Sequence, residues 1–454
     1  MNKLHNNLTE GSVTKQLLKF SIPFLITNLI QAFYNIADTV IVGWFVGADG
    51  ISGVSIGGQV TMVIMNFVVG LATGGTVLVA QYIGAKRDDD VKSTIGTLLS
   101  MLIALAVVIT AVMLAFGGTV LSWMQTPAEA FEQALVYLNI CIAGNIFIFL
   151  YNAISAIQRG MGDSKRPLMF ISIACATNVV LDLLLVGVFD MKAAGAAVAT
   201  IISQALSVII SIAYLSKNGF IFDFKISSFK VDRQKLANII KVGFPSAVQN
   251  VIVGFSFILV TVLVNGFGVN ASAAVGIAGK FNSVAILPAA AMSMSIASMA
   301  GQNIGAGFYD RAQKTLWTGI RISLVIGLTI FALAQLFPAQ IMRMFTTDEA
   351  VIQMGVVYLR SFCFDYLMVA VVFCVNGLIN GAGHTTFSLI NGMLCSIFLR
   401  FPMAYLFGIY LDMGLAGIGL GAPLASFGSL VLGLAYYKSG KWKNNKIVLN
   451  DKKA

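Results

Sequence analysis

Long apolar runs separated by short charged loops set the strongest limit on what this chain can fold into. The first run, residues 20–46, contains one charged side chain, Asp38. A helix that crosses a bilayer needs about 20 consecutive apolar residues, so a run of this kind is long enough to span a membrane. Charged residues make up 11% of the 454-residue chain, whereas soluble domains carry about 25%. The sequence therefore predicts a membrane protein.

Twelve runs have this character, and they fall into two groups of six. We expect helices in the first group near residues 20–46, 53–83, 94–117, 131–158, 167–189 and 194–216. We expect the second group near residues 241–267, 272–302, 315–337, 351–379, 387–410 and 413–437. Strands of a membrane barrel would alternate polar and apolar residues over about ten positions, and these runs do not. The predicted fold class is an all-α membrane protein.

The chain has a net charge of +10, and its basic residues are distributed unevenly among the loops of the predicted topology. Alternate loops and the two ends of the chain hold 24 of the 29 Lys and Arg residues, and the remaining loops hold only Lys192 and Arg343. Basic residues collect on the cytoplasmic side of membrane proteins. We therefore expect a multi-pass protein of the cell membrane with both termini in the cytoplasm. This placement of charge argues against nucleic-acid binding, which favours a basic stripe along one face.

The two groups of helices also repeat one another in sequence. At an offset of 222 residues, Pro23 falls on Pro245 and Asn28 falls on Asn250. At an offset of 221, QYIGA at 81–85 falls on QNIGA at 302–306, and Tyr137 falls on Tyr358. An even number of helices per repeat gives both repeats the same direction, and such repeats enclose a site at their interface. We expect six-helix lobes around a central cleft at 12–216 and 241–438, a cytoplasmic linker at 217–240 and a basic cytoplasmic tail at 439–454.

Polar residues gather on one side of the first predicted helix. Tyr34 and Asn35 lie one turn before Asp38, and Gln31 lies two turns before it. Residues three, four and seven apart share a helix face. An aspartate at the centre of a membrane helix costs about 2.5–3.5 kcal/mol to insert, so this face is expected to line a cavity or contact another helix.

The fifth and sixth predicted helices offer partners for Asp38. Asn178 and Asp182 are four residues apart and share a face, and Thr200 follows on the next helix. Two carboxylates with amide and hydroxyl oxygens could bind Na⁺, or one carboxylate could bind a proton. An alternative interpretation places Asp182 at the headgroup boundary, where it would only anchor the helix end.

The second half lacks a matching pair of acids. Val260 and Met403 stand at the positions that match Asp38 and Asp182. The one deep acid there, Asp365, could contact a substrate or could pair with Arg360 or Lys280. The sequence leaves these two alternatives open.

Several other functional classes lack support in the sequence. The five cysteines lie in apolar segments without a CxxC pair, so we expect neither disulfides nor a structural metal site. The chain contains no GxxxxGK[ST] motif, which argues against an ATP-driven pump. Because no nucleophile–base arrangement is visible, an enzyme is not expected.

Taken together, these motifs resemble the multidrug and toxic compound extrusion (MATE) transporters. The motifs are DTVIVG in the first helix, the paired QYIGA and QNIGA segments and the RGMGD loop, and the resemblance covers residues 12–437. It implies that Asp38, Asn178, Asp182 and Thr200 form the N-terminal cation site of the prokaryotic branch. It also implies that Gln31, Tyr137 and Asn152 line the cavity of that lobe.

The resemblance implies a secondary antiporter. Such a protein would export amphipathic, mainly cationic, drugs in exchange for Na⁺ or H⁺ by alternating access, without a cofactor. We expect a monomer in the lipid bilayer whose substrate is a small amphipathic molecule, contacted by Gln31, Tyr34, Asn35, Tyr137, Asn152 and Asp365. The alternative is a flippase for lipid-linked oligosaccharides, which related folds perform.

Overall fold

The computed structural model describes residues 6–444 and residue 447, and the regular secondary structure of this part of the chain is entirely helical, without strands. Eleven of its helices are long and apolar enough to cross a membrane, and a bent pair, Ala128–Ala143 with Asn145–Gly160, brings the number of spans to twelve. The predicted all-α fold with twelve spans is confirmed. Of the predicted basic tail, residues 445–446 and 448–454 lie outside the described residues.

The chain divides into two compact units. The N-terminal unit contains Ile26–Gly243 together with Asn6 and Asn7, and the C-terminal unit contains Leu8–Leu25 together with the described residues from Phe244 onward. The boundaries lie inside helices near Pro23 and Pro245, each of which sits within a long helix. Each unit thus includes the beginning of a helix that continues into the other unit. The lobe boundaries expected from the sequence stay a prediction.

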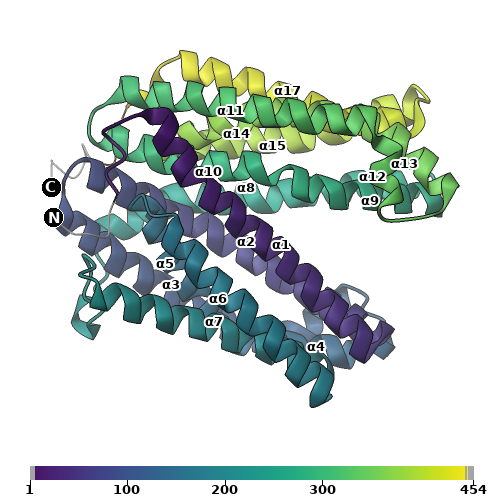
Figure 1. Ribbon diagram of the computed structural model, residues 1–454, viewed down its shortest axis with the longest axis horizontal. Helices are drawn as coiled ribbons and strands as arrows, with labels where there is room; N and C mark the ends of the chain where they lie inside the picture. The colour runs from purple at the N-terminus through teal and green to yellow at the C-terminus, as the bar shows by residue number, and fades with distance from the viewer. Residues whose placement is uncertain (1–5, 445–446, 448–454) are drawn as a thin grey trace. The chain divides into compact units, whose positions relative to one another are not determined.

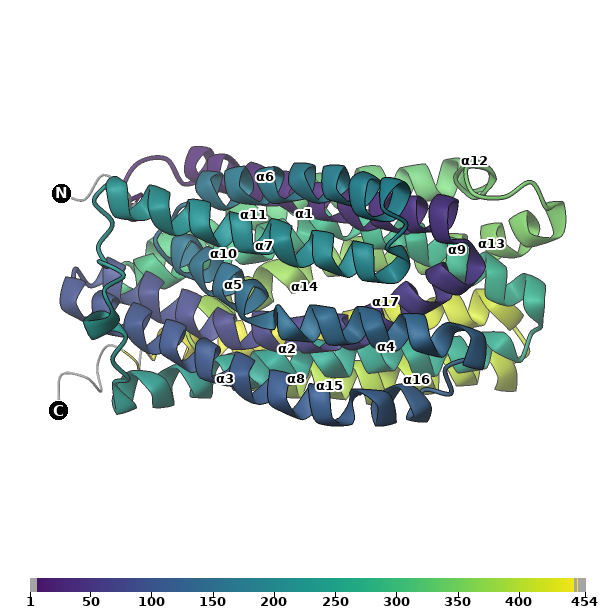
Figure 2. The same ribbon diagram turned by 90° about the horizontal axis from the view of Figure 1, so that it is seen from below.

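The helices of the N-terminal unit follow the predicted spans closely. In chain order they are α1 (Val13–Val46, of which this unit holds the part from Ile26), α2 (Ala48–Gly84), α3 (Asp88–Trp123), α4 (Ala128–Ala143), α5 (Asn145–Gly160), α6 (Lys165–Asp182), the π-helical η1 (Leu183–Val188), α7 (Lys192–Lys217), the short η2 (Ile226–Ser228) and the start of α8 (Arg233–Asn265). Helix α2 packs against α3, α4 and α5 (Figure 2). Between α4 and α5 the chain bends by 52° at Gly144.

The C-terminal unit is more interrupted. After α8 it contains α9 (Val269–Ala285), α10 (Leu287–Gly305), α11 (Tyr309–Leu336), α12 (Pro338–Arg343), α13 (Glu349–Phe362), α14 (Phe364–Gly381), α15 (Thr385–Cys395), the π-helical η3 (Ser396–Arg400), α16 (Phe401–Tyr405), the π-helical η4 (Leu406–Tyr410), α17 (Gly414–Lys438) and η5 (Lys441–Lys443). Helix α14 lies beside α10, α11 and α17 (Figure 1).

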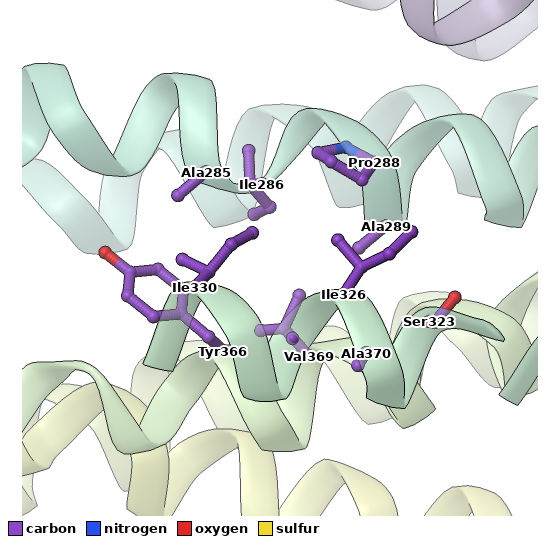
Figure 3. Close-up of a pocket in the computed structure, with 11 residues that line it drawn as sticks. Ala285, Ile286, Pro288, Ala289, Ser323, Ile326, Ile330, Tyr366, Val369 and Ala370 are labelled. Carbon is purple, nitrogen blue, oxygen red and sulfur yellow. The ribbon is translucent and has the colours of Figure 1, made fainter. Parts of the chain in front are cut away.

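A proline accounts for one of these interruptions. Helix α2 is continuous over 37 residues, whereas the corresponding span breaks at Ile286, just before Pro288 in α10. A proline cannot donate the backbone hydrogen bond that a helix interior needs. Ile326, Ile330 and Tyr366 line a hollow of about 20 Å³ beside the break (Figure 3). That volume admits about one water molecule, so the hollow is a packing defect and not a substrate site.

The beginning of α8 is held tightly in the N-terminal unit. Gly74 of α2 and Gly243 of α8 face each other so closely that a Cβ atom on either would meet backbone atoms of the other helix. The Lys235 ammonium group lies 2.7 Å from the Asp90 carboxylate and 3.0 Å from the Tyr82 hydroxyl. Small residues permit such close approach of helices in lipid, and the buried ion pair fixes the start of α8 on α2 and α3.

The beginning of α1 is held in a comparable way in the C-terminal unit. Leu17, Phe20 and Phe24 belong to the same buried apolar cluster as residues of α10, α11 and α14. The Arg311 guanidinium at the start of α11 donates to the backbone carbonyl oxygens of Glu10 and Gly11, at 2.6 and 2.8 Å. Each unit thus anchors the first turns of one proline-containing helix.

Candidate cation site

The two deep acids of the N-terminal unit come together, although they lie 144 residues apart in the sequence. Asp38 on α1 and Asp182 at the end of α6 interact through their carboxyl groups. Asp182 and Asn178 are fully buried, at 0% exposure, and Asp38 is half-buried. No Lys or Arg forms an ion pair with either acid in the described part of the chain.

A hydroxyl group links three helices at this point. The Thr200 Oγ1 atom on α7 lies 3.1 Å from the Tyr34 hydroxyl of α1, and it accepts a hydrogen bond from Asn178 Nδ2 of α6 at 3.4 Å. Tyr34 and Asp38 share a face because they are four residues apart, as do Asn178 and Asp182. The predicted cluster of Asp38, Asn178, Asp182 and Thr200 is therefore present as a contact network, with Tyr34 as its fifth member.

The local backbone explains how α1 reaches α6. The π-helical turn η1 begins directly after Asp182, and single π-helical turns often occur at functional sites. Gly187 within η1 packs against the Phe45 ring of α1, where a Cβ atom would come within about 3.0 Å of the ring. The glycine lets α1 pack closely on the end of α6 and so brings Asp38 near Asp182.

Several oxygen atoms of the cluster could still accept a hydrogen bond or bind a cation. Asp38 Oδ1, both carboxylate oxygens of Asp182 and Asn178 Oδ1 are buried without a hydrogen-bond partner. Two buried carboxylates side by side are stable only when a proton or another cation neutralises their charge. Carboxylate, amide and hydroxyl oxygens suit a small hard cation. The residues present therefore fit either Na⁺ or a shared proton.

The other residues expected to line the cavity differ in how close they lie to the acidic cluster of Asp38 and Asp182. Tyr137 on α4 is buried and interacts electrostatically with Asp38 and Tyr34. Asn152 on α5 donates to the carbonyl oxygen of Ile148 in its own helix, at 2.8 Å. Gln31 and Asn35 are exposed on α1. The structure thus brings only Tyr137 of this set to the acidic cluster.

Cys141 is a neighbour of the site that the sequence analysis missed. It lies one turn after Tyr137 on α4, interacts with that tyrosine, and is close enough to Asp38 to interact electrostatically. The four-residue spacing from Tyr137 was the signal that could have identified it. The sequence expectation for the cysteines concerned only disulfides and structural metal sites, and it assigned Cys141 no place near Asp38.

In the C-terminal unit, Asp365 has a different environment. It is buried at 5% exposure, hydrogen-bonds to Ser426 and interacts electrostatically with Arg400. Of the two alternatives left open by the sequence, this supports interaction with a basic side chain. The basic group that acts on Asp365 electrostatically is Arg400 of η3 and not Arg360 or Lys280, and the two side chains form no ion pair in the described part of the chain.

A cavity of about 430 Å³ lies within the C-terminal unit between α8, α9 and α13. Its lining combines aliphatic, aromatic and neutral polar side chains, among them Val260, Phe257, Asn282 and Tyr358. Small-molecule sites commonly enclose about 300–1,000 Å³ and have mostly apolar walls with a few polar groups. The cavity is therefore large enough for part of a drug-sized molecule.

Comparisons with known proteins match this architecture. The family model MatE matches residues 23–184 and again residues 245–406, once in each repeat. The chain is 30% identical over 452 residues to "Probable multidrug resistance protein YpnP" of Bacillus subtilis, covering 97% of this chain and 98% of that protein. It is 27% identical to "Probable multidrug resistance protein YoeA" of the same organism, over 97% of this chain and 96% of that one. A solved outward-facing multidrug resistance MATE family transporter has the same fold, with a TM-score of 0.90, 24% identity and 98% coverage of both chains.

Proposed function

Because the chain belongs to the MatE family, it is a multidrug efflux transporter of the membrane and not an enzyme, and we propose that it works as a secondary antiporter. It exports small amphipathic, mainly cationic, compounds in exchange for Na⁺ or H⁺. The relatives are named for multidrug resistance, which supports this substrate class over the oligosaccharide flippase considered as the alternative. The flippase is not favoured.

One observation carries the coupling mechanism: Asp38 and Asp182 lie together, with buried oxygens that no protein group satisfies. When a cation or proton binds there, it neutralises the acids and draws α1 and α6 together. When it leaves, the two carboxylates repel each other and favour a different position of α1. Because α1 begins in the C-terminal unit and continues from Ile26 in the N-terminal unit, a movement of α1 involves residues of both units.

Alternating access follows from linkage between the two ligands. If the cation favours one arrangement of the units and the drug favours another, each ligand must weaken the binding of the other by the same factor. Gln31, Tyr34, Asn35, Tyr137 and Asn152 are proposed to contact the substrate in the N-terminal unit. We place both termini in the cytoplasm, in agreement with the basic residues of the alternate loops, and expect the cell membrane as location and the monomer as the working unit.

The test is dye efflux from proteoliposomes that contain the purified protein. Ethidium export is measured under a Na⁺ gradient alone and then under a pH gradient alone, for the wild type, Asp38→Asn and Asp182→Asn. We expect one of the two gradients to drive export in the wild type and neither to drive it in the two variants. Thr39→Val is the matched control, since the Thr39 hydroxyl bonds only to the Asn35 carbonyl of its own helix. Unchanged gradient-driven export by Asp38→Asn would refute the proposed role.

A further inference from the structure

The first turns of α3 and α11 correspond to each other in the two units. Both helices begin two residues after a turn with positive φ, at Lys86 and Gly307. Their first residues, Asp88 and Tyr309, are 221 positions apart, the offset at which QYIGA and QNIGA match. At this offset three small residues of α3 are matched by larger ones of α11: Ser93 by Lys314, Gly96 by Trp317 and Ser100 by Arg321.

In the N-terminal unit, the segment between α7 and α8 covers this face of α3. A Cβ atom on Gly96 would lie 2.5 Å from the carbonyl oxygen of Ser228, so the segment packs directly on the helix. The Ser93 hydroxyl donates to the Asp232 carboxylate at 3.3 Å, and the Asp232 backbone N–H donates to the Thr97 hydroxyl at 3.1 Å. The N-terminal unit therefore closes this surface with its own chain.

In the C-terminal unit, none of the described segments closes the matching face of α11. Trp317 is 45% exposed, and Lys314 and Arg321 are exposed as well. These residues are three and four positions apart, so they share one side of the helix. Leu316 and Ile320 on the other side are buried. The helix thus packs on its unit with one side and presents two cations and an indole ring with the other.

The end of α17 extends this face. The Trp317 Nε1–H donates to the Tyr437 hydroxyl at 3.2 Å, and the two ring centres lie 6.0 Å apart. Lys438 and Lys441, which follow Tyr437 closely, are exposed. Among the described residues, no acid forms an ion pair with any of these lysines or with Arg321. We define the basic–aromatic face by its six residues: Lys314, Trp317, Arg321, Tyr437, Lys438 and Lys441.

The same side of α11 continues as a surface suited to lipid. Val325 and Leu328, one and two turns after Arg321, are 65% and 53% exposed. The helix has 28 residues and is about 42 Å long, more than the hydrocarbon core of about 30 Å. Its first turns therefore extend into the headgroup region, where Trp and Tyr are enriched. Helix side chains tilt toward the helix beginning, which brings the Arg321 guanidinium toward the headgroups.

We propose that the basic–aromatic face binds the phosphate headgroup of an anionic phospholipid, which covers in the C-terminal unit the surface that the N-terminal unit covers with its own chain. Phosphate oxygens suit Arg and Lys side chains. The acyl chains continue along Val325 and Leu328, so a lipid fits both the charged and the apolar part of this side of α11. An acidic peptide fits only the charged part. Residues 445–454 of the chain itself contain three Lys and one Asp, so their charge does not complement the face.

The test is quenching of Trp317 fluorescence by brominated lipids in nanodiscs. Of the four tryptophans, Trp44 and Trp123 are 78% and 80% exposed, and Trp442 is buried at 0%. The variant Trp44→Phe/Trp123→Phe therefore keeps Trp317 as its one exposed tryptophan. Phosphatidylcholine discs receive brominated phosphatidylglycerol or, at the same mole fractions, brominated phosphatidylcholine. We expect half-maximal quenching at a mole fraction at least about fivefold lower for phosphatidylglycerol, since one basic residue near an anionic surface contributes about this factor.

Three charge variants in the same background assign the preference to the face. Lys314→Gln/Arg321→Gln should abolish the preference for phosphatidylglycerol, and Lys314→Arg/Arg321→Lys should keep it because the charges remain. Lys217→Gln/Lys230→Gln removes the same amount of charge from exposed positions of the N-terminal unit. This matched control should leave the preference unchanged.

Trp317→Phe, which retains Trp44 and Trp123, should be quenched equally by the two lipids. Equal quenching of Trp317 by both lipids would overturn the proposal, because contact with lipid alone needs no headgroup site. Weak quenching of Trp317 by both lipids would overturn it as well, since protein would then cover the face. A preference lost in Lys217→Gln/Lys230→Gln would also contradict it, by assigning the attraction to the net charge of the protein.

Discussion

The two units use the same helical plan to handle buried charge in opposite ways. In the N-terminal unit, Asp38 and Asp182 lie together and leave several buried oxygens without a protein partner. In the C-terminal unit, Val260 stands at the position that matches Asp38. The buried acid of that unit, Asp365, comes from α14 and interacts electrostatically with Arg400, which donates to Ser256 Oγ at 2.7 Å. Two adjacent acids need a cation or a proton to balance their charge, whereas a single buried acid has no like charge beside it. The comparison indicates that the pairing of two acids distinguishes the N-terminal site.

The largest expected effect comes from removing the charge that distinguishes the units. Asp38→Asn should lower gradient-driven dye export by about 100-fold, within the range of about 5–150-fold typical of coupling between two sites. Val260→Asn, the same side chain at the matching position, should leave export within about twofold of the wild type. Initial export rates in proteoliposomes test both. Equal losses of export in the two variants would contradict the proposed difference between the units.

A second difference concerns how each unit holds the beginning of a long helix. Lys235→Met removes the ammonium group that pairs with Asp90 at 2.7 Å, and both groups are largely buried. Breaking a buried pair from one side costs about 3–5 kcal/mol, and about 2 kcal/mol is expected here because Asp90 keeps partial access to solvent. Thermal unfolding in detergent measures the loss.

The matched change in the other unit is Arg311→Met. It removes hydrogen bonds from a charged donor to the carbonyl oxygens of Glu10 and Gly11, for which we expect a loss of about 1.5 kcal/mol. A larger drop in unfolding temperature for Arg311→Met than for Lys235→Met would reverse the expected order.

Tyr34→Phe should have a smaller effect on ion binding. The variant removes the hydroxyl that lies 3.1 Å from Thr200 Oγ1 and leaves the ring in place. A hydrogen bond of this kind contributes about 1 kcal/mol, so the affinity for the coupling ion should fall about fivefold. Titration of Na⁺ or H⁺ against dye release measures the affinity, and Thr39→Val is again the control, since its hydroxyl bonds to the Asn35 carbonyl of its own helix. An unchanged affinity in Tyr34→Phe would exclude the hydroxyl from the site.

The smallest effect is expected at an exposed ion pair. Arg343 lies 2.9 Å from Glu349, and their side chains are 58% and 61% exposed. Exposed pairs contribute about 0–1 kcal/mol, so Glu349→Gln should shift the unfolding temperature far less than Lys235→Met. Comparable shifts would show that burial does not explain the anchoring of α8.

The sequence predicted the twelve spans and the acidic cluster because local patterns determine them. Apolar runs reveal helices without any knowledge of neighbours, and spacings of four residues showed which of Asp38, Asn178 and Asp182 share a face. It could not identify Arg400 as a neighbour of Asp365, because the two residues lie 35 positions apart on different helices and no spacing rule connects them. Gln31 and Asn35 show a second limit: a shared helix face does not determine which part of that face another helix covers.

The division of α1 between the units has a consequence for biosynthesis. Leu17 and Phe20 are translated long before some of the residues they pack against, because the apolar cluster they join includes Ile320 and Leu378. At about 5–20 residues per second, roughly 300 residues of further translation separate the first turns of α1 from their partners by about 15–60 seconds. During that interval the first turns of α1 lie in the membrane without their packing surface. A transcript truncated after the first repeat would therefore yield a helix whose leading third has nothing to pack against.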